Sequence, residues 1–344
     1  MRFIGSKVLL LKKIDSVIQE NVKHAESFCD IFSGTASVAR YFKKRYKIIS
    51  NDILHFSYVL QMATLFNNQK PEFSSVLKKI GHNPFAYFAA FIPNKSALKE
   101  PVFIYENYSP NEHANRQYFT NDNALRIDFV RQTLETWQQD GLLTVGEYFY
   151  LLAGLIEAVP FVSNIAGTYG AFLKHWDARA FKTLDLVELE VEDNNHLNEC
   201  FNEDSNQLIR KIKGDILYID PPYNHRQYAP NYHVLETISR YDQPLITGKT
   251  GLRPYRDIYS KYCLKKSVLS EFTDLIKNAQ FSNIIVSYSN EGIMSSSEIE
   301  DVLLNFGIKN SFKLYTIPYR RYKHIPGVVK HDLEELIFFI KKDI

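Results

Sequence analysis

The stretch GDILYIDPPYNHRQYAPNYHVLE, residues 214–236, decides how this chain is interpreted. Residues 216–219 form a short run of β-branched, aliphatic and aromatic side chains, which predicts a buried strand. Two prolines then end the strand, because proline cannot donate to a sheet ladder. Asp220 and Tyr223 are therefore expected at the carboxyl end of a buried strand, which is where open α/β sheets bind their ligands.

A strand–helix–strand pattern lies near the amino terminus. SFCDIF (27–32) predicts a strand, TASVARYFKKRY (35–46) a helix, and KIIS (47–50) a second strand that ends at Asn51-Asp52. Such a unit implies parallel pairing through a right-handed crossover. Further strands are predicted at LVELEV (186–191), LNECF (197–201), NIIVSYS (283–289), FKLYTI (312–317) and ELIFFI (335–340).

The region between these two groups of strands has a different pattern. From Leu54 to Ala158 it contains helical segments joined by polar, proline-broken loops, and EYFYLLAGLIEAV (147–159) is the clearest helix. We expect an inserted, mainly helical domain at 56–179, within a domain formed by 1–55 and 180–344. The fold class is α/β, with one mostly parallel sheet whose last strand is antiparallel.

Charge is nearly balanced overall, at a formal +2 over 344 residues, but basic residues gather in two segments. Residues 245–266 and 309–331 each contain six lysines and arginines interleaved with tyrosines. Phosphate contacts and stacking rings are what a nucleic-acid surface needs. A solvated charged face explains the same composition, so both interpretations stay open.

Three widely spaced cysteines, Cys29, Cys200 and Cys263, show no CxxC pattern. This favours a reducing, cytoplasmic location over a disulfide framework or a zinc site. The ten histidines have no metal-ligand spacing, and we expect no metal. The apolar runs are too short for a membrane span.

The turn after the first strand, CDIFSGTASVAR (29–40), has features of a nucleoside site. Gly34 lets the backbone approach a ligand closely, and the helix that follows offers free N–H groups. Eighteen positions later Asp52 ends the next strand, where an acid can accept both hydroxyls of a ribose. A structural turn with a solvent-facing aspartate is the alternative.

Together these motifs resemble the Dam-type, alpha-class adenine-specific DNA methyltransferases, which use S-adenosylmethionine. RFIGSKVLLLKKI (2–14) resembles motif X, DIFSGTASVA motif I, ISND motif II, FNEDSNQLI motif III and DPPY motif IV. NIIVSYSNEG and IPYRRYKH are similar to later motifs that shape the target pocket. The resemblance implies a Rossmann-like class I methyltransferase sheet, with 56–179 as the target-recognition domain. One departure is Ala36, which replaces the second glycine of FxGxG.

The resemblance also implies roles for particular residues. The catalytic residues are Asp220, Pro221, Pro222 and Tyr223. The residues that bind S-adenosylmethionine, and its product S-adenosylhomocysteine, are Gly5, Lys7, Asp30, Phe32, Ser33, Gly34, Asp52 and Asp204. The residues that contact DNA are Asn164, Tyr169, Lys174, Arg226, Tyr228, Arg320, Arg321 and Lys323.

The chemistry of DPPY follows from the substrate. The adenine amino nitrogen is a poor nucleophile, because its lone pair is delocalised into the ring. Hydrogen bonds from its two hydrogens to the Asp220 carboxylate and the Pro221 carbonyl favour a pyramidal nitrogen aimed at the sulfonium methyl. Tyr223 is expected to stack on the base after it leaves the duplex.

The partner implied is double-stranded DNA, with a cognate restriction endonuclease in the same system. Two alternatives stay open: the same chemistry on an adenine in RNA or on a cytosine amino group, and a catalytically silent DNA-binding subunit. A nicotinamide-dependent oxidoreductase is disfavoured, because GxGxxG is missing and two prolines occupy the active edge.

Overall fold

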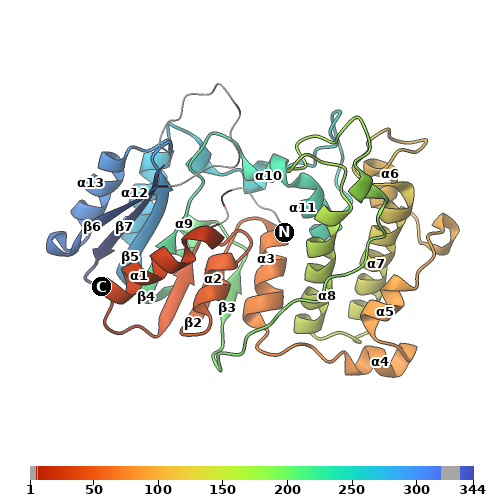
Figure 1. Cartoon of the computed structure of the whole chain (residues 1–344), viewed down its shortest axis with the longest axis horizontal. Coiled ribbons are helices and arrows are strands. Elements are labelled where there is room, and N and C mark those ends of the chain that lie inside the picture. Colours follow the sequence, from red (N-terminus) through yellow and green to blue (C-terminus); the bar gives the residue numbers. More distant parts are fainter. Residues whose placement is uncertain (1–4, 6, 319–333) are drawn as a thin grey trace. The chain divides into compact units, whose positions relative to one another are not determined.

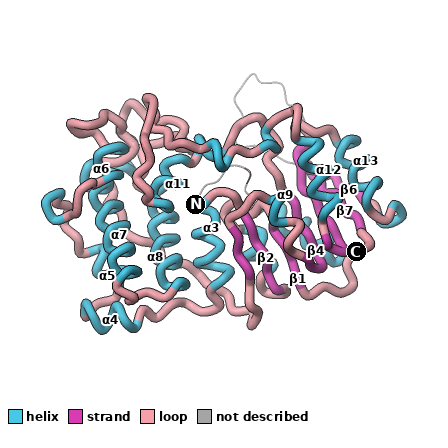
Figure 2. The backbone as a smooth tube through the Cα atoms, turned by 180° about the vertical axis from the view of Figure 1, so that it is seen from behind, coloured by secondary structure: helices cyan, strands magenta, loops and turns pink. Residues whose placement is uncertain are grey.

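The structure is a computed structural model that describes residues 5, 7–318 and 334–344, in two compact units (Figure 1). The sheet unit comprises Ser6–Ile53, His196–Gln227 and Tyr259–Ile344. The helical unit comprises Leu54–Asn195 and Tyr228–Ile258, together with the amino terminus as far as Gly5. In Figure 2 the magenta strands belong to the sheet unit.

The sheet unit contains one seven-stranded sheet in the order β3-β2-β1-β4-β5-β7-β6. The strands are β1 (Ser27–Asp30), β2 (Lys47–Asn51), β3 (Glu199–Phe201), β4 (Lys213–Ile219), β5 (Gln280–Ser289), β6 (Lys313–Pro318) and β7 (Glu334–Lys341). Strands β1 to β5 pair in parallel, and β7 pairs antiparallel with both β5 and β6. The predicted α/β class, with a mostly parallel sheet and an antiparallel last strand, is confirmed.

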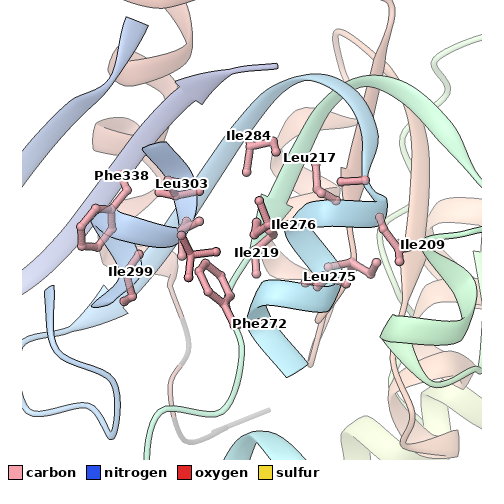
Figure 3. Close-up of a cluster of buried hydrophobic side chains, with 14 of the residues drawn as sticks. Ile209, Leu217, Ile219, Phe272, Leu275, Ile276, Ile284, Ile299, Leu303 and Phe338 are labelled. Carbon is pink, nitrogen blue, oxygen red and sulfur yellow. The ribbon is translucent and has the colours of Figure 1, made fainter. Parts of the chain in front are cut away.

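Helices cover both faces of this sheet. The helices of the sheet unit are α1 (Leu11–Asn21), α2 (Ser37–Phe42), α9 (Ser205–Leu208), α12 (Val268–Asn278) and α13 (Ser296–Phe306). Phe272 of α12 and Leu303 of α13 pack with alternate residues of β4, β5 and β7 in the main apolar core (Figure 3). On the other face Phe42 of α2 stacks on Phe28 of β1, with ring centroids 4.5 Å apart. Burial on both faces explains why these strands read as continuous apolar runs.

The helical unit is built around α8. Its helices are α3 (His55–Gln61), α4 (Ser74–Ile80), α5 (Pro84–Ala89), α6 (Phe103–Tyr108), α7 (Asn121–Gln139), α8 (Val145–Ala158), α10 (Tyr228–Asn231) and α11 (His233–Arg240). A capping box between Thr144 and Glu147 starts α8, which packs against α3, α7 and α11. Among the described residues, no helix combines the length and apolarity that crossing a membrane requires.

The bounds 56–179 of the expected inserted domain stay a prediction, and the helical unit of the structure has wider bounds. It extends to Leu54–Asn195, and the segment Tyr228–Ile258 after the DPPY strand also belongs to it. The physical reason is Glu236 of α11, whose buried carboxylate accepts hydrogen bonds from the backbone N–H groups of His55 and Phe56 at 3.1 and 3.2 Å. This carboxylate satisfies the free amides that begin α3, so α11 and α3 are held together.

LVELEV also differs from its prediction, because it forms no strand. It is an extended segment that runs along α8 in the helical unit. The Tyr150 hydroxyl donates to the Leu189 carbonyl at 2.7 Å, and the Val187 N–H donates to the Gly154 carbonyl at 3.1 Å. Hydrogen bonds with the Tyr150 hydroxyl and the Gly154 carbonyl therefore take the place of the strand pairing that the alternating pattern of LVELEV predicted.

Gly154 provides a stability test of this packing. A Cβ at position 154 would lie 2.7 Å from the Val187 carbonyl oxygen, a backbone atom that cannot rotate away. We expect Gly154→Ala to lower the stability of the protein by about 1–3 kcal/mol, seen as a lower unfolding temperature by circular dichroism. Gly167→Ala is the matched control, because a Cβ there meets nothing within 4 Å. Equal unfolding temperatures for the two variants would contradict this account of the segment.

Candidate active site

Three acidic residues lie at the carboxyl ends of neighbouring parallel strands. Asp30 is the last residue of β1 and pairs in register with Ser50 of β2 and Tyr218 of β4. Asp52 and Asp220 directly follow β2 and β4. Because β1 lies between β2 and β4, the sheet brings the three carboxyl groups to the same edge.

Lys7 links this edge to the last strand. Its ammonium lies 3.3 Å from a carboxylate oxygen of Asp220 and forms an ion pair and hydrogen bond with Glu335 of β7. The side chains of Lys7 and Glu335 are 5% and 7% exposed, whereas Asp220 keeps 16% exposure and stays accessible. The Ser287 hydroxyl of β5 donates to Glu335 at 3.3 Å. One ammonium is thus shared by two carboxylates.

This environment shifts the titration of the acid and of the base. Burial raises the pKa of Asp220 to about 7; nearby Lys7 works against the shift and Glu335 adds to it. Burial by itself would lower the pKa of Lys7, but the carboxylates of Asp220 and Glu335 outweigh it and raise the pKa above its ordinary value. Lys7 is therefore a permanent cation, and Asp220 changes charge near neutral pH.

Tyr223 presents an aromatic ring beside these charges. Its ring centroid lies 5.4 Å from the Lys7 ammonium, and it meets the ring of Tyr288 edge-on at 6.2 Å. Its carbonyl accepts a hydrogen bond from the Ile293 N–H at 3.0 Å. Pro221 is buried, whereas Pro222 and Tyr223 are half-buried. A fixed carboxylate and a partly open ring thus occur within four residues of one another.

The predicted nucleoside turn has the expected backbone. Gly34 has a positive φ of 53°, and its N–H donates to the Asp52 carboxylate at 2.8 Å. Ala36, where the resembled family commonly has glycine, also lies in the left-handed region, with a φ of 59°. The Ser33 N–H donates to the Asn51 carbonyl at 2.9 Å, which fixes the turn on β2. Ala36 thus holds a left-handed conformation that glycine adopts at lower cost.

The other predicted cofactor residues have varied positions. Phe32 is half-buried and packs edge-on against Tyr262 at 5.0 Å. Asp30 is buried, and burial together with Asp220 and Asp52 raises its pKa well above the ordinary value. Asp204 is exposed and caps α9, accepting hydrogen bonds from the N–H groups of Asn206 and Gln207 at 3.0 and 3.1 Å. Gly5, in the helical unit, has a positive φ of 82°.

These residues fit a cationic nucleoside. Asp52 offers acceptor oxygens for hydroxyl groups beside a glycine turn, and Phe32 offers a half-buried apolar ring. Asp220 carries a negative charge at this edge once it is ionised above about pH 7, which suits a sulfonium. Lys7 supplies a cation for a carboxylate. In the parts of the chain that the structure describes, no His, Cys, Asp and Glu residues cluster as metal ligands.

The predicted DNA contacts fall into three groups. Lys174 and Arg226 are exposed. Asn164 and Tyr169 are buried: Asn164 bonds to the Gln117 and Leu173 carbonyls, each at 3.0 Å, and the Tyr169 hydroxyl bonds to Ser163 at 3.1 Å. Their bonds within the protein hold the loop between α8 and residue 177 in shape. Tyr228 is half-buried and stacks on Tyr232 at 6.4 Å. Arg320, Arg321 and Lys323 lie outside the described residues.

Sequence reasoning missed Glu335 and Asn51. Asn51 is buried; its side chain donates to the Ile31 and Glu203 carbonyls and accepts from the Glu203 N–H, which joins the turns after β1 and β3. Each lies in an apolar strand run, and a polar side chain at a buried strand position was the available signal. The hydrogen-bond partners of the two residues, however, lie far from them in the chain.

A family model for the D12 class of N6 adenine-specific DNA methyltransferases matches residues 3–302. The chain belongs to this family. It is 52% identical to type II methyltransferase M.FokI of Planomicrobium okeanokoites, over the whole of this chain and 53% of that protein. It is 43% identical to modification methylase StsI of Streptococcus sanguinis, over 99% of this chain and 52% of that protein.

A third relative matches along nearly its full length. Type II methyltransferase M.NlaIII of Neisseria lactamica is 39% identical over 94% of this chain and 92% of that protein. This chain spans about half the length of M.FokI and StsI but nearly all of M.NlaIII. The D12-class homology therefore covers both the sheet unit and the helical unit.

The left-handed residue at position 36 generates a binding prediction. Glycine adopts this conformation freely, alanine at a modest cost, and a β-branched residue at a large one. We expect Ala36→Val to weaken binding of S-adenosylhomocysteine by about tenfold or more, as strain of about 1–3 kcal/mol distorts the turn, whereas Ala36→Gly stays near wild type. Isothermal titration calorimetry measures both affinities. Wild-type affinity in the valine variant would show that the turn does not shape the binding site.

The raised pKa of Asp220 generates a stability prediction. In the unfolded chain this carboxyl ionises at its ordinary pKa, but in the folded protein only near pH 7, so its ionised form opposes folding. Asp220→Asn should therefore unfold at a higher temperature than wild type above pH 7. The difference should shrink as the pH falls toward about 4, the ordinary aspartate pKa. Thermal unfolding across this pH range measures it.

Asp215, on the same strand, provides a control of opposite sign. Burial alone would raise its pKa, but hydrogen bonds from the Glu26 and Ser27 N–H groups and the Ser27 hydroxyl lower it. Its ionised form stabilises the fold, so Asp215→Asn should lower the unfolding temperature at neutral pH. A destabilised Asp220→Asn protein at pH 8 would overturn the interpretation of Asp220.

Proposed function

We propose that this chain transfers a methyl group from S-adenosylmethionine to the 6-amino group of adenine within a specific sequence of double-stranded DNA. The observation that carries the proposal is the combination at one sheet edge of the Asp52–Gly34 turn with Lys7, Asp220 and Tyr223. Membership of the D12 class supports adenine as the target, and M.FokI and M.NlaIII are named type II methyltransferases.

The cofactor is assigned to the edge at β1, β2 and β3. Asp52 holds the ribose hydroxyls, the turn at Gly34 lets the backbone approach, and Phe32 packs on the adenine ring. Asp204, exposed at the start of α9, accepts from the cofactor's amino group. Lys7 binds its carboxylate. When bound, S-adenosylmethionine supplies an electrophilic methyl group on a positively charged sulfur.

Asp220 and Pro221 act on the target base. The Asp220 carboxylate and the Pro221 carbonyl accept the two hydrogens of the amino group, which orients the nitrogen lone pair for attack. A carbon–nitrogen bond forms as the carbon–sulfur bond breaks, and one proton leaves the amino group to Asp220 or water. Because Asp220 ionises near pH 7, its acceptor form prevails at mildly alkaline pH. Alignment of the reacting atoms supplies a large share of the rate.

Tyr223 and the loop between α8 and residue 177 account for the choice of substrate. A base must leave the duplex to reach Asp220, and the half-buried Tyr223 ring stacks on it to offset part of the lost stacking. Lys174 and Arg226 contact phosphates, since both are exposed cations. Asn164 and Tyr169 act indirectly by fixing the loop that carries Lys174. A restriction endonuclease for the same DNA sequence is the proposed partner in the cell.

The test is a map of modified adenines. A host that lacks other adenine methylation expresses the chain, and single-molecule sequencing scores methyladenine in its DNA. We expect one recurrent sequence context in which adenine is modified. Asp220→Asn should lower methyl transfer by about 10²–10³-fold or more, because a hydrogen-bond acceptor for the reacting group is lost. Lys277→Ala, an exposed cation of α12 outside both basic segments, is the control with retained activity.

The same preparation separates the alternatives. Purified protein is assayed with tritiated S-adenosylmethionine on duplex DNA, on RNA, and on DNA whose methylated bases are identified by mass spectrometry. Finding methylcytosine in place of methyladenine in the DNA, or methyladenine in RNA alone, would show that the proposed substrate is wrong. Cofactor binding without transfer to any of these would indicate a silent DNA-binding subunit.

A further inference from the structure

Glu335 is a buried carboxylate for which the mechanism above has no role. It lies near the start of β7, where it pairs in register with Ser289 of β5, and it is buried. Lys7 and Ser287 both donate hydrogen bonds to its Oε1 oxygen. The same Lys7 ammonium is 3.3 Å from Asp220. A buried cation thus stands between the carboxylate that acts on the base and a second one that does not.

The number of N–H groups on lysine makes this arrangement informative. An ammonium has three donors and no acceptor. The two carboxylate partners of Lys7 among the described residues are Glu335 and Asp220, which leaves a third donor for the carboxylate of a bound cofactor. If Glu335 were absent, Asp220 would be the remaining anion in contact with the buried ammonium within residues 7–318 and 334–344. The ammonium would then bind Asp220 fully, because an unpaired buried charge costs several kcal/mol.

Full pairing with Lys7 would impair Asp220 as an acceptor. Its oxygens would be occupied by the ammonium, and an incoming amino group would have to compete for them. A shared ammonium leaves part of the acceptor capacity of Asp220 open. Ser287 supports this balance from β5, since its hydroxyl holds the Glu335 oxygen that Lys7 also contacts.

We propose that Glu335 is a positioning residue for methyl transfer: it anchors the Lys7 ammonium so that Asp220 remains available to the amino group of the base. This proposal rests on the proposed function. It adds a third member, from the last strand of the sheet, to the pair formed by Lys7 and Asp220. Glu335 itself does not touch substrate; it acts through Lys7.

The first experiment compares Glu335→Gln with wild type in kcat/KM for DNA between about pH 5 and pH 9, with saturating cofactor. Glutamine keeps the size of the side chain and removes its charge. We expect a loss of roughly 10²-fold at pH 8, as the ammonium moves onto Asp220. We also expect the acidic limb of the profile to move to lower pH by about one unit, because a negative neighbour of Asp220 is lost.

Opposite shifts of the acidic limb in two variants distinguish a positioning role of Glu335 from a general loss of structure. Lys7→Met removes the positive neighbour, so its acidic limb should move to higher pH. Glu334→Gln is the matched control: the same substitution one position earlier on β7, with wild-type activity and profile expected. Wild-type activity in Glu335→Gln, or an acidic limb that stays in place, overturns the proposal. If Glu335→Gln does not fold, Glu335→Asp keeps the charge but retracts it; reduced activity with an unmoved limb is expected, and unreduced activity overturns the proposal.

A measurement without DNA keeps this proposal separate from the proposed function. Carbon-13 NMR of carboxyl-labelled aspartate follows the titration of Asp220, with Asp220→Asn as the assignment control. Its pKa should fall in Glu335→Gln and rise in Lys7→Met. If wild type methylates no DNA, the proposed function fails while this titration still tests the anchoring of Lys7. If wild type is active and the titration is unmoved, the positioning role alone fails.

Discussion

The candidate active site is organised around a buried ion cluster, in which the Lys7 ammonium is held between the carboxylates of Asp220 and Glu335. Removing such charges from water costs several kcal/mol each, which is recovered only when the partners meet with good geometry. The three residues come from the amino terminus, the end of β4 and the start of β7. The cluster therefore requires that β4 and β7 both occupy their places in the sheet.

Strand order explains why the remaining groups converge. Because β1 is flanked by β2 and β4, the turns after β1, β2 and β4 are neighbours. Hydrogen bonds of Asn51 connect the turn after β1 to the turn after β3. The edge thus contains two kinds of polar residue. Some, such as Asn51, make hydrogen bonds to backbone groups of the protein and stabilise the turns. Others, such as Asp220 and Tyr223, are only partly buried. Burial, more than residue type, separates the two.

The sequence predicts those features that depend on neighbouring residues. The apolar runs of β1, β4 and β5, the proline stop after Ile219 and the glycine at Gly34 are local signals, and each marks the element found. Contacts between distant segments carry no such signal. Lys7 and Glu335 are 328 positions apart, and Glu236 caps a helix that begins 181 positions earlier. The alternating pattern of LVELEV was misleading, because Tyr150 and Gly154 of α8 provide the partners that a neighbouring strand would provide.

In the loop that follows α8, one set of residues holds the backbone in place and another set is exposed. Asn164 and Tyr169 are buried and hold its backbone, whereas Ala166, Gly167, Ala171 and Lys174 are exposed. Mutations at the exposed positions disturb few interactions within the protein, so they carry a small penalty in stability. Such a loop can diversify during evolution while its scaffold stays constant. Under the proposed function, substitutions at these exposed positions change what the loop contacts without rebuilding the helical unit that supports it.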